Sequence, residues 1–340
     1  MRPRCLGLAV VLAAGCAGSP PAMPPHTLID GHYAMGTVLE VTLHGPDPAT
    51  LDRAGARIFE TAARLDRLFS RHRADSDVSR LNAAAGGEPV VVAPEVAELV
   101  RVSLDYAERT GGSFDVTVGA LVALWTLAAE RDVPPTGAEL ARARSRVGAS
   151  TVQVGPGDRF ALAPGASIDL GGIAKGFALD RMLPLLREEG VSSALLSFGQ
   201  SSVWAVGSPP DGEGWRLLVR SPEGRFAGIV TVRDLALSVS GSLGQWSEIG
   251  GRRFGHVLDP RSGWPLTRPR EAVVVARDAA LAEALSKALL VLGEVEGIGL
   301  VASYPGCEAL LLDADGRRWS TPGWQSATSF DALDGSERDR

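Results

Sequence analysis

The chain has 340 residues, of which 45% are hydrophobic and 22% are charged, and its formal net charge is −6. This length allows a large core, either in one domain or in two closely joined ones. The mildly acidic balance and the lack of a basic run in the sequence argue against a nucleic-acid partner.

The N-terminus has the pattern of a bacterial lipoprotein signal. Arg2 and Arg4 precede an apolar run through Leu6–Ala14, which is too short to span a bilayer, and small residues stand directly before Cys16. Residues 1–16 are therefore interpreted as a signal, with Cys16 becoming the lipidated first residue. An ordinary cleaved signal is the alternative, because Ala17–Pro25 could also hold a cleavage site.

A lipoprotein signal predicts an extracytoplasmic protein anchored on the periplasmic side of a bacterial membrane. Residues 17–27 contain four prolines and are expected to form a stiff tether. An acylated Cys16 cannot pair with Cys307, so no structural disulfide is expected. We assign residues 28–325 to the folded domain and residues 326–340 to a polar tail that frays beyond Ala327.

The first half of the chain predicts mainly helices. A turn-like segment at His32–Thr37 leads into an alternating strand. The polar stretch Ser70–Asn82 has the composition of a solvated connection, and Asp115 or Thr117 could cap a helix. The predicted strand is Val38–Leu43, and the predicted helices are Ala49–His72, Pro94–Arg109, Val118–Trp125 and Gly137–Val147.

The segment Ile168–Gly176 combines an aspartate, three glycines and a lysine within nine positions. Ala161–Ile168 resembles a hairpin or strand that leads in, and Ala174–Glu189 resembles a helix that leads out. A helix that opens after glycines presents main-chain N–H groups and a positive dipole end to an anion. Gly171, Gly172 and Gly176 would let a phosphate-sized group approach the main chain, with Lys175 adding a charge.

Lysine is rare in this chain. Among 34 Lys and Arg residues only Lys175 and Lys287 are lysine. Their scarcity suggests positions that need a compact ammonium rather than a planar guanidinium. The alternative is that two lysines stand on solvated faces by chance. The glycine-rich turn favours the functional interpretation for Lys175, whereas for Lys287, on a predicted helix, both remain open.

The second half predicts a mostly antiparallel sheet. The segment Phe254–Gly263 is predicted as a strand stopped by Asp-Pro and a turn, and Gly293 ends a helix predicted at Asp278–Leu292. The predicted strands are Ser193–Phe198, Ser202–Gly207, Trp215–Arg220, Gly228–Val232, Ala236–Ser240, Ala272–Ala276 and Glu308–Asp313.

Several ordered motifs between His32 and Leu312 together resemble the ApbE family of FAD:protein FMN transferases. They are Met35-Gly36-Thr37, Ser70 to Asn82, Gly112–Thr117, Asp169–Gly176, Ser240-Gly241, His256–Gly263 and the helix Ala279–Gly293. The resemblance implies an α+β fold of the T-fold-like type, with a mostly antiparallel sheet and packed helices. It also implies an enzyme that binds FAD with Mg²⁺, cleaves the pyrophosphate and attaches FMN to a Thr or Ser hydroxyl of an acceptor flavoprotein.

The resemblance further implies roles for individual residues. Asp169, Gly172 and Lys175 would surround the FAD phosphates, with the Gly172 carbonyl directed to the metal. His256 would contact the cofactor and handle the proton, with Asp259 near it as a second catalytic residue. The residues implied to contact the flavin nucleotide are Met35, Ser113, Phe114 and Asp115.

The chain departs from the family pattern on the last helix. Glu283 and Lys287 stand where the family usually has an aspartate and a threonine that bind Mg²⁺. Glutamate can still ligate a metal, but a protonated lysine cannot, and the i,i+4 spacing also favours an ion pair. Either Lys287 replaces part of the metal's charge, or the metal site is lost and the protein binds flavin without transferring it. Gly199-Gln200 and Ser242–Trp246 also differ from the family pattern.

Three classes of function follow. The first is an FMN transferase, with an FAD pyrophosphatase that releases FMN and AMP as its close variant. The second is a non-catalytic flavin-binding lipoprotein that keeps the nucleotide pocket. The third is a phosphate-binding module for another nucleotide, which rests on the glycine-rich segment alone.

Overall fold

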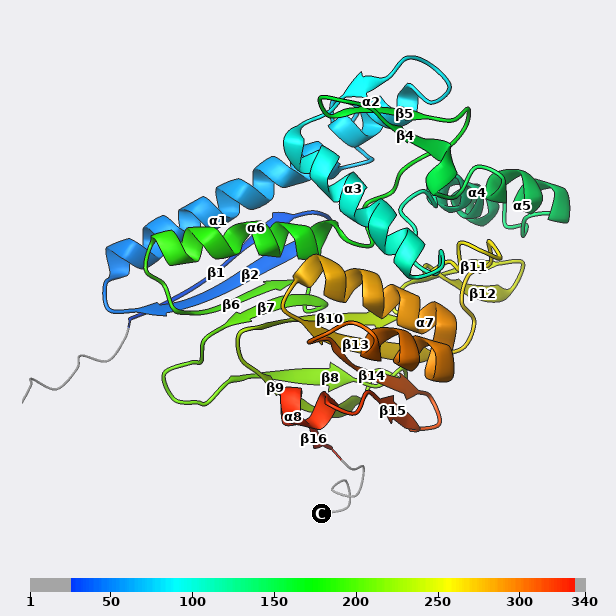
Figure 1. Ribbon diagram of the computed structural model, residues 1–340. Coiled ribbons are helices and arrows are strands. Elements are labelled where there is room, and N and C mark those ends of the chain that lie inside the picture. Colours follow the sequence, from blue (N-terminus) through cyan, green and yellow to red (C-terminus); the bar gives the residue numbers. More distant parts are fainter. Residues whose placement is uncertain (1–25, 334–340) are drawn as a thin grey trace, which may run out of the picture.

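An eight-stranded antiparallel sheet forms the centre of the protein (Figure 1). The computed structural model describes residues 26–333. The strand order is β1-β2-β6-β7-β10-β13-β14-β15. The α+β prediction is confirmed. The strands are β1 His26–Ala34, β2 Thr37–Gly45, β6 Ser193–Phe198, β7 Ser202–Val206, β10 Leu235–Gly241, β13 Arg270–Ala276, β14 Glu308–Asp313 and β15 Arg318–Ser320.

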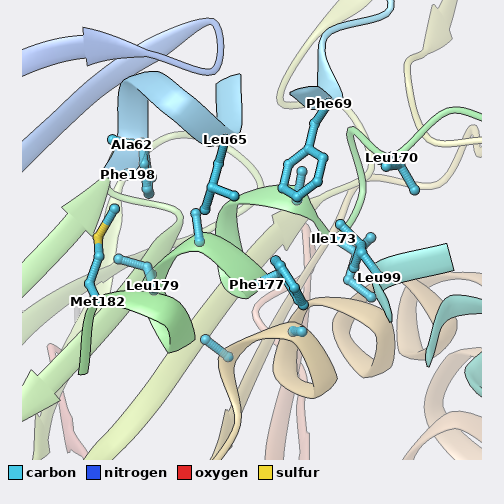
Figure 2. Packing of buried hydrophobic residues seen from close by; sticks show 14 of the residues in the cluster. Ala62, Leu65, Phe69, Leu99, Leu170, Ile173, Phe177, Leu179, Met182 and Phe198 are labelled. Atoms are coloured by element: carbon cyan, nitrogen blue, oxygen red, sulfur yellow. The ribbon is translucent and has the colours of Figure 1, made fainter. Parts of the chain in front are cut away.

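Three long helices cover one face of this sheet, namely α1 Pro48–Phe69, α6 Ala174–Glu188 and α7 Ala279–Ala302 (Figure 1). α1 is amphipathic, and Leu65 and Phe69 lie on its buried stripe. Figure 2 shows these side chains packed against residues of α6, among them Phe177. The helices and the sheet thus enclose the main hydrophobic core, which positions the first turn of α6 over one end of the sheet.

A three-stranded sheet covers the opposite face. It consists of β8 Trp215–Arg220, β9 Phe226–Val232 and β16 Asp331–Ala332. The prediction that the chain frays beyond Ala327 is wrong for the residues described, because β16 pairs with β9 and α8 Trp324–Thr328 packs beside it. The rings of Trp324 and Phe330 lie 6.2 Å apart. Burial of these aromatic side chains outweighs the polar composition of the segment.

The remaining elements form a cap at one end of the central sheet (Figure 1). The predicted solvated connection after Ser70 contains a short helix instead, because Ser76 caps it and both Val78 and Leu81 are buried. The cap comprises α2 Asp77–Ala83, α3 Pro94–Arg109, α4 Gly119–Glu130, α5 Gly137–Arg144, the 3₁₀ turn Ala149–Thr151, the strands β3 Val90–Val91, β4 Val152–Val154 and β5 Arg159–Leu162, and the hairpin β11 Trp246–Ile249 with β12 Arg252–Gly255.

α7 contains a break at Gly293. The φ of Gly293 is 80°, so the first helical segment ends where the glycine predicted, but the chain then resumes as helix to Ala302. Arg270 lies against this break and pairs with Glu294 at 2.5 Å. In the part of the chain that the structure describes, no helix has the length and apolarity to span a membrane.

α6 and α7 cross in close contact at Gly176. A Cβ added to Gly176 would collide with the Ala279 main chain and would lie 2.8 Å from the Ala280 nitrogen. The Asp180 carboxylate, one turn further along α6, accepts hydrogen bonds from the N–H groups of Ala279 (2.9 Å) and Ala280 (3.0 Å) and from the Trp204 indole (2.9 Å). Gly176 was expected to let a phosphate approach the main chain, but it lets the start of α7 approach instead.

The close contact at Gly176 predicts that a methyl group added there lowers the stability of the protein. Gly176→Ala should lower the free energy of unfolding by about 1–3 kcal/mol, because the added methyl must push two main chains apart. Urea unfolding followed by circular dichroism measures it. Gly299→Ala is the matched control, since Gly299 lies in helix with open space around it. The control should be neutral or more stable by up to about 1 kcal/mol, and equal stability of the two variants would contradict the packing argument.

Candidate active site

The predicted motifs converge at one end of the central sheet. The Met35-Gly36 turn joins β1 to β2, and the Gly199–Ser201 turn joins β6 to β7. The register pairs Leu39 with Phe198, and Ser202 with Ser238, which brings both turns and the end of β10 to the same edge. Turns from separate hairpins therefore meet where α6 begins and where the middle of α7 passes.

Met35 lies in a tight hairpin turn with positive φ values at Met35 (50°) and Gly36 (76°). The Met35 N–H donates to Asp66 of α1 at 3.1 Å. Thr37 packs against the second turn so closely that a Cβ at Gly199 would lie 2.5 Å from the Thr37 hydroxyl oxygen. The half-buried Met35 side chain packs against the main core, so this turn is fixed from both sides.

The segment before α6 is held by an asparagine from the cap. Asn82 donates to the Ile168 carbonyl at 2.9 Å and accepts from the Ile168 N–H at 2.7 Å. The Asp169 N–H donates to the Val116 carbonyl at 2.8 Å. The Asp169 carboxylate accepts from the Gly171 N–H at 2.9 Å and lies 3.3 Å from the Arg71 guanidinium.

No side chain caps the first turn of α6, and the Ala174 N–H donates to the Leu170 carbonyl at 2.9 Å. Among the hydrogen bonds of residues 26–333, the next N–H groups, of Lys175 and Gly176, are left to other partners. Gly172 is half-buried and Gly171 is exposed, directly before this turn. Neither glycine has a positive φ, so they are not needed for a left-handed conformation there. The expected arrangement of an open helix start beside accessible glycines is therefore present, while Gly176 has the packing role described above.

The segment Ser113–Asp115 runs beside the Asp169 segment, and the buried Phe114 ring faces Gly172. The Ser113 hydroxyl is buried and donates to the Thr110 carbonyl at 2.8 Å. Asp115 accepts from the N–H (2.8 Å) and hydroxyl (2.6 Å) of Thr117 rather than capping α4. Burial raises the pKa of Asp115, against the lowering effect of those two hydrogen bonds.

Asp115 also lines an open cleft of about 490 Å³. Arg144 of α5 and Arg261 contribute two guanidinium groups to its walls. The other lining residues are Gly112, Ala141, Ser145, Val147, Gly148 and Pro260. The cleft has the size of a nucleotide site and offers both a carboxylate and cations for polar contacts.

Both lysines of the chain connect to this end of the sheet through adjacent residues, Ser201 at the end of the turn and Ser202 at the start of β7. Lys175 donates to the Ser201 hydroxyl at 2.8 Å. The Ser202 hydroxyl donates to one oxygen of the Glu283 carboxylate, and Lys287 pairs with the other oxygen at 3.2 Å. No local signal in the sequence singles out Ser201 or Ser202, because only the tertiary contacts distinguish them from other serines.

The pKa of Lys287 reflects its burial and the charges around it. Burial lowers the pKa of Lys287, the carboxylate of Glu283 opposes this, and the charge of Lys175 lowers the pKa further. Glu283 is fully buried, whereas the Lys287 side chain keeps 22% of its surface exposed. The lysine end of this ion pair is therefore the part that a ligand can reach.

His256 directly follows β12, and its ring contacts Gln245, which directly precedes β11. Its Nδ1 lies 3.0 Å from the Gln245 carbonyl oxygen, which can only accept, so Nδ1 carries the proton and Nε2 is free in the neutral ring. Burial lowers the pKa of His256, and Lys287 and Lys175 lower it further, against the hydrogen bond to Gln245. The residue remains exposed to solvent, so Nε2 is available to accept a proton.

The Asp259 carboxylate makes no hydrogen bond to the His256 ring within residues 26–333. Among the hydrogen bonds of residues 26–333, the Asp259 carboxylate accepts from the N–H and Nε of Arg261, both at 3.0 Å, within its own turn. Its main chain closes the same turn, with Gly263 N–H donating to the Asp259 carbonyl at 2.7 Å. Asp259 therefore shapes the loop, and Gln245 takes the place of a partner for His256.

An aromatic cluster packs against the loop that contains Asp259 and Gly263. The Trp125 indole of α4 donates to the Gly263 carbonyl at 2.8 Å and packs against Phe254 and Trp264. The Ser242 carbonyl oxygen packs against Gly255, where an added Cβ would collide with it. Ser242, one of the departures from the family pattern, is buried and donates to the Arg268 carbonyl at 2.6 Å.

Comparisons of the sequence with known proteins point to one family. The model of the ApbE family matches residues 35–311. A protein of Klebsiella pneumoniae named FAD:protein FMN transferase is 31% identical over 96% of this chain and 95% of its own length. A protein of the same name from Treponema pallidum is 31% identical over 83% of each chain.

Solved structures give the same result. The flavin transferase ApbE from Vibrio cholerae has a TM-score of 0.79 at 25% identity, covering 89% of this chain and all of that one. The apo form of the Pseudomonas stutzeri flavinyl transferase ApbE has a TM-score of 0.78 at 28% identity, covering 90% of this chain and 98% of that one. The match of the family model over most of the sequence, together with these relatives, shows that this chain belongs to the ApbE family.

Proposed function

We propose that this protein uses FAD as a substrate and transfers its FMN part to a Thr or Ser hydroxyl of an acceptor flavoprotein. The observation that carries the proposal is the convergence of Lys175, Lys287 and a histidine with a free Nε2 at one edge of the sheet. A chain of the ApbE family with two ammonium groups beside a base has the parts that pyrophosphate cleavage needs.

The reaction balances with the groups present. The acceptor hydroxyl oxygen bonds to the phosphorus of the FMN half, while the bond from this phosphorus to the bridging oxygen breaks. AMP leaves with the bonding electron pair, and the hydroxyl proton passes to Nε2 of His256. The ammonium groups of Lys175 and Lys287 offset the negative charge that develops on the leaving phosphate.

We assign the remaining FAD contacts to the walls around these groups. Met35 and Phe114 supply apolar surface, and Asp115 reaches the nucleotide from the cleft that it lines. Asp169, paired with Arg71, fixes the approach to the first turn of α6. Ser113 acts through the position of its main chain, since its hydroxyl is used by Thr110.

The donor set does not fit a magnesium ion at Glu283. Magnesium prefers oxygen ligands in a near-octahedral arrangement. Here one carboxylate oxygen accepts from Ser202 and the other is paired with a lysine. An ammonium 3.2 Å from the carboxylate also repels a second cation. With Lys287 in this position, Gly172 and Glu283 are left as an incomplete ligand set, and no step above uses a metal.

We further propose that the protein acts outside the cytoplasm, anchored through a lipid on Cys16. The support comes from the sequence, in which Arg2, Arg4 and the apolar run Leu6–Ala14 precede small residues and Cys16. Residues 1–25 lie outside the part of the chain that the structure describes. The acceptor would then be a flavoprotein exposed on the same side of the membrane.

The first test follows the products from FAD. Full-length protein in detergent should convert FAD to AMP, and membrane proteins of a bacterial extract added to the mixture should acquire flavin fluorescence that survives a denaturing gel. Release of free FMN with AMP, and no labelled protein, would favour the pyrophosphatase. Binding of FAD with no AMP under any metal condition would contradict both and favour the non-catalytic flavin-binding protein.

The role of His256 as a base predicts how the rate of AMP release depends on pH. A base must be unprotonated, and the pKa of His256 is lowered from its ordinary value of 6.5. The rate of AMP release should therefore rise with pH through a midpoint below 6.5 and then level off. His256→Gln should lower kcat by about 10²–10⁴-fold and remove this acidic limb.

His44→Gln is the matched control, because His44 lies at the opposite end of β2 from the Met35 turn. It should leave both the rate and the acidic limb unchanged. An acidic limb that persists in His256→Gln would assign the proton transfer to another group.

The lipid anchor has its own test. Cells that express the chain in the presence of labelled palmitate should incorporate the label into the wild type and into Cys5→Ser, but not into Cys16→Ser. Cys5 is the control because it lies in the same signal, upstream of the cleavage position. A wild type without label would support the ordinary cleaved signal.

A further inference from the structure

The only two lysines of the 340-residue chain meet at the same site. Lys175 comes from the first turn of α6, and Lys287 comes from the middle of α7. They are linked through the neighbouring residues Ser201 and Ser202, which contact Lys175 and Glu283 respectively. Two rare residues from different helices thus connect to adjacent residues at one end of the sheet, which chance placement on solvated faces does not explain.

The Glu283 carboxylate holds Lys287 in a fixed position. Glu283 is fully buried, with one oxygen accepting from Ser202 and the other 3.2 Å from the lysine Nζ. Next to it, the Ser286 hydroxyl lies 2.8 Å from that of Ser240 and 3.0 Å from that of Ser238. This buried polar layer lies beside the carboxylate, whose two oxygens are already paired with Ser202 and Lys287.

Lys287 retains donors for a ligand. An ammonium has three N–H donors, of which Glu283 uses one. The side chain is 22% exposed, and the charges of Lys287 and Lys175 both lower the pKa of His256. A phosphate oxygen that approaches there would meet two ammonium groups, whereas a free divalent cation would be repelled by both.

We propose that the Lys287 ammonium, held by Glu283, replaces a divalent cation and binds the FAD pyrophosphate together with Lys175. The inference rests on the proposed function and deepens it, because it states that this chain binds and splits FAD without a divalent metal. A fixed ammonium needs no metal to be recruited before substrate binds, and it offers N–H donors to oxygens that a metal would otherwise coordinate.

The test compares metal conditions on the full-length protein in detergent. Binding of FAD and of ADP is measured by equilibrium dialysis, and AMP release from FAD by chromatography, in excess EDTA and then with Mg²⁺. The wild type should bind both ligands and release AMP in EDTA. Adding Mg²⁺ should change the two affinities and the rate of AMP release by less than about twofold. Binding or AMP release that requires Mg²⁺ in the wild type would overturn the proposal.

Two variants separate the charge from the fold. Lys287→Met alone leaves a buried carboxylate unpaired and could unfold the protein. Glu283→Gln with Lys287→Met keeps the shape without buried charge, and it should weaken ADP binding in EDTA by about 10–100-fold. Arg233→Thr is the control, because it removes a cation from an exposed pair with Asp234 at the opposite end of β10 from Ser240. Equal ADP affinity of the double variant and the wild type would overturn the proposal.

A third measurement detects the metal directly. Mn²⁺, titrated into the protein without nucleotide and followed by electron paramagnetic resonance, should remain free with the wild type. Lys287→Thr exchanges the ammonium for a hydroxyl oxygen and should bind about one Mn²⁺ per chain. Tight binding of Mn²⁺ to the wild type would overturn the proposal.

The outcomes also distinguish this inference from the proposed function. ADP binding in EDTA that depends on Lys287, without any AMP release from FAD, would support the lysine site and contradict the transferase. AMP release that occurs only with Mg²⁺ would support the transferase and contradict the lysine site.

Discussion

The close crossing of α6 and α7 at Gly176 is the constraint on which the site depends. Because Gly176 has no side chain, the main chain of Ala279 can approach α6 directly. Asp180 then binds the first N–H groups of α7 and the indole of Trp204, which ties both helices to β7. This arrangement fixes the start of α6, with Lys175, relative to the middle of α7, with Glu283 and Lys287.

The second constraint is the burial of charge within α7. A carboxylate with no exposed surface is stable only if its oxygens are paired, and Ser202 and Lys287 provide the partners. One helix face therefore carries both an anion that is hidden and a cation that is accessible. A protein with this pair and with Lys175 nearby has a preorganised site for a doubly charged linkage such as a pyrophosphate.

The histidine loop is built from elements that are distant in the sequence. Trp125 of α4 supports Gly263, and Gln245 of the β11 hairpin orients the ring of His256. The resemblance drew attention to the segment His256–Gly263, within which the Asp259 carboxylate bonds to Arg261 rather than to the ring of His256. The orientation of a ring depends on whichever carbonyl lies within reach of Nδ1, and this is a property of packing.

The sequence by itself determined the elements and the family. Periodicity and capping predicted Pro94–Arg109, Ser193–Phe198, Trp215–Arg220 and Glu308–Asp313 with the bounds that the structure has, since these signals are local. The scarcity of lysine singled out Lys175 and Lys287 before any contact was known. Only the tertiary structure brought them together, gave Gly176 its packing role and ordered the segment after Ala327 on β9. Those outcomes depend on sheet register and on helix crossing, in which residues about a hundred positions apart determine one another's surroundings.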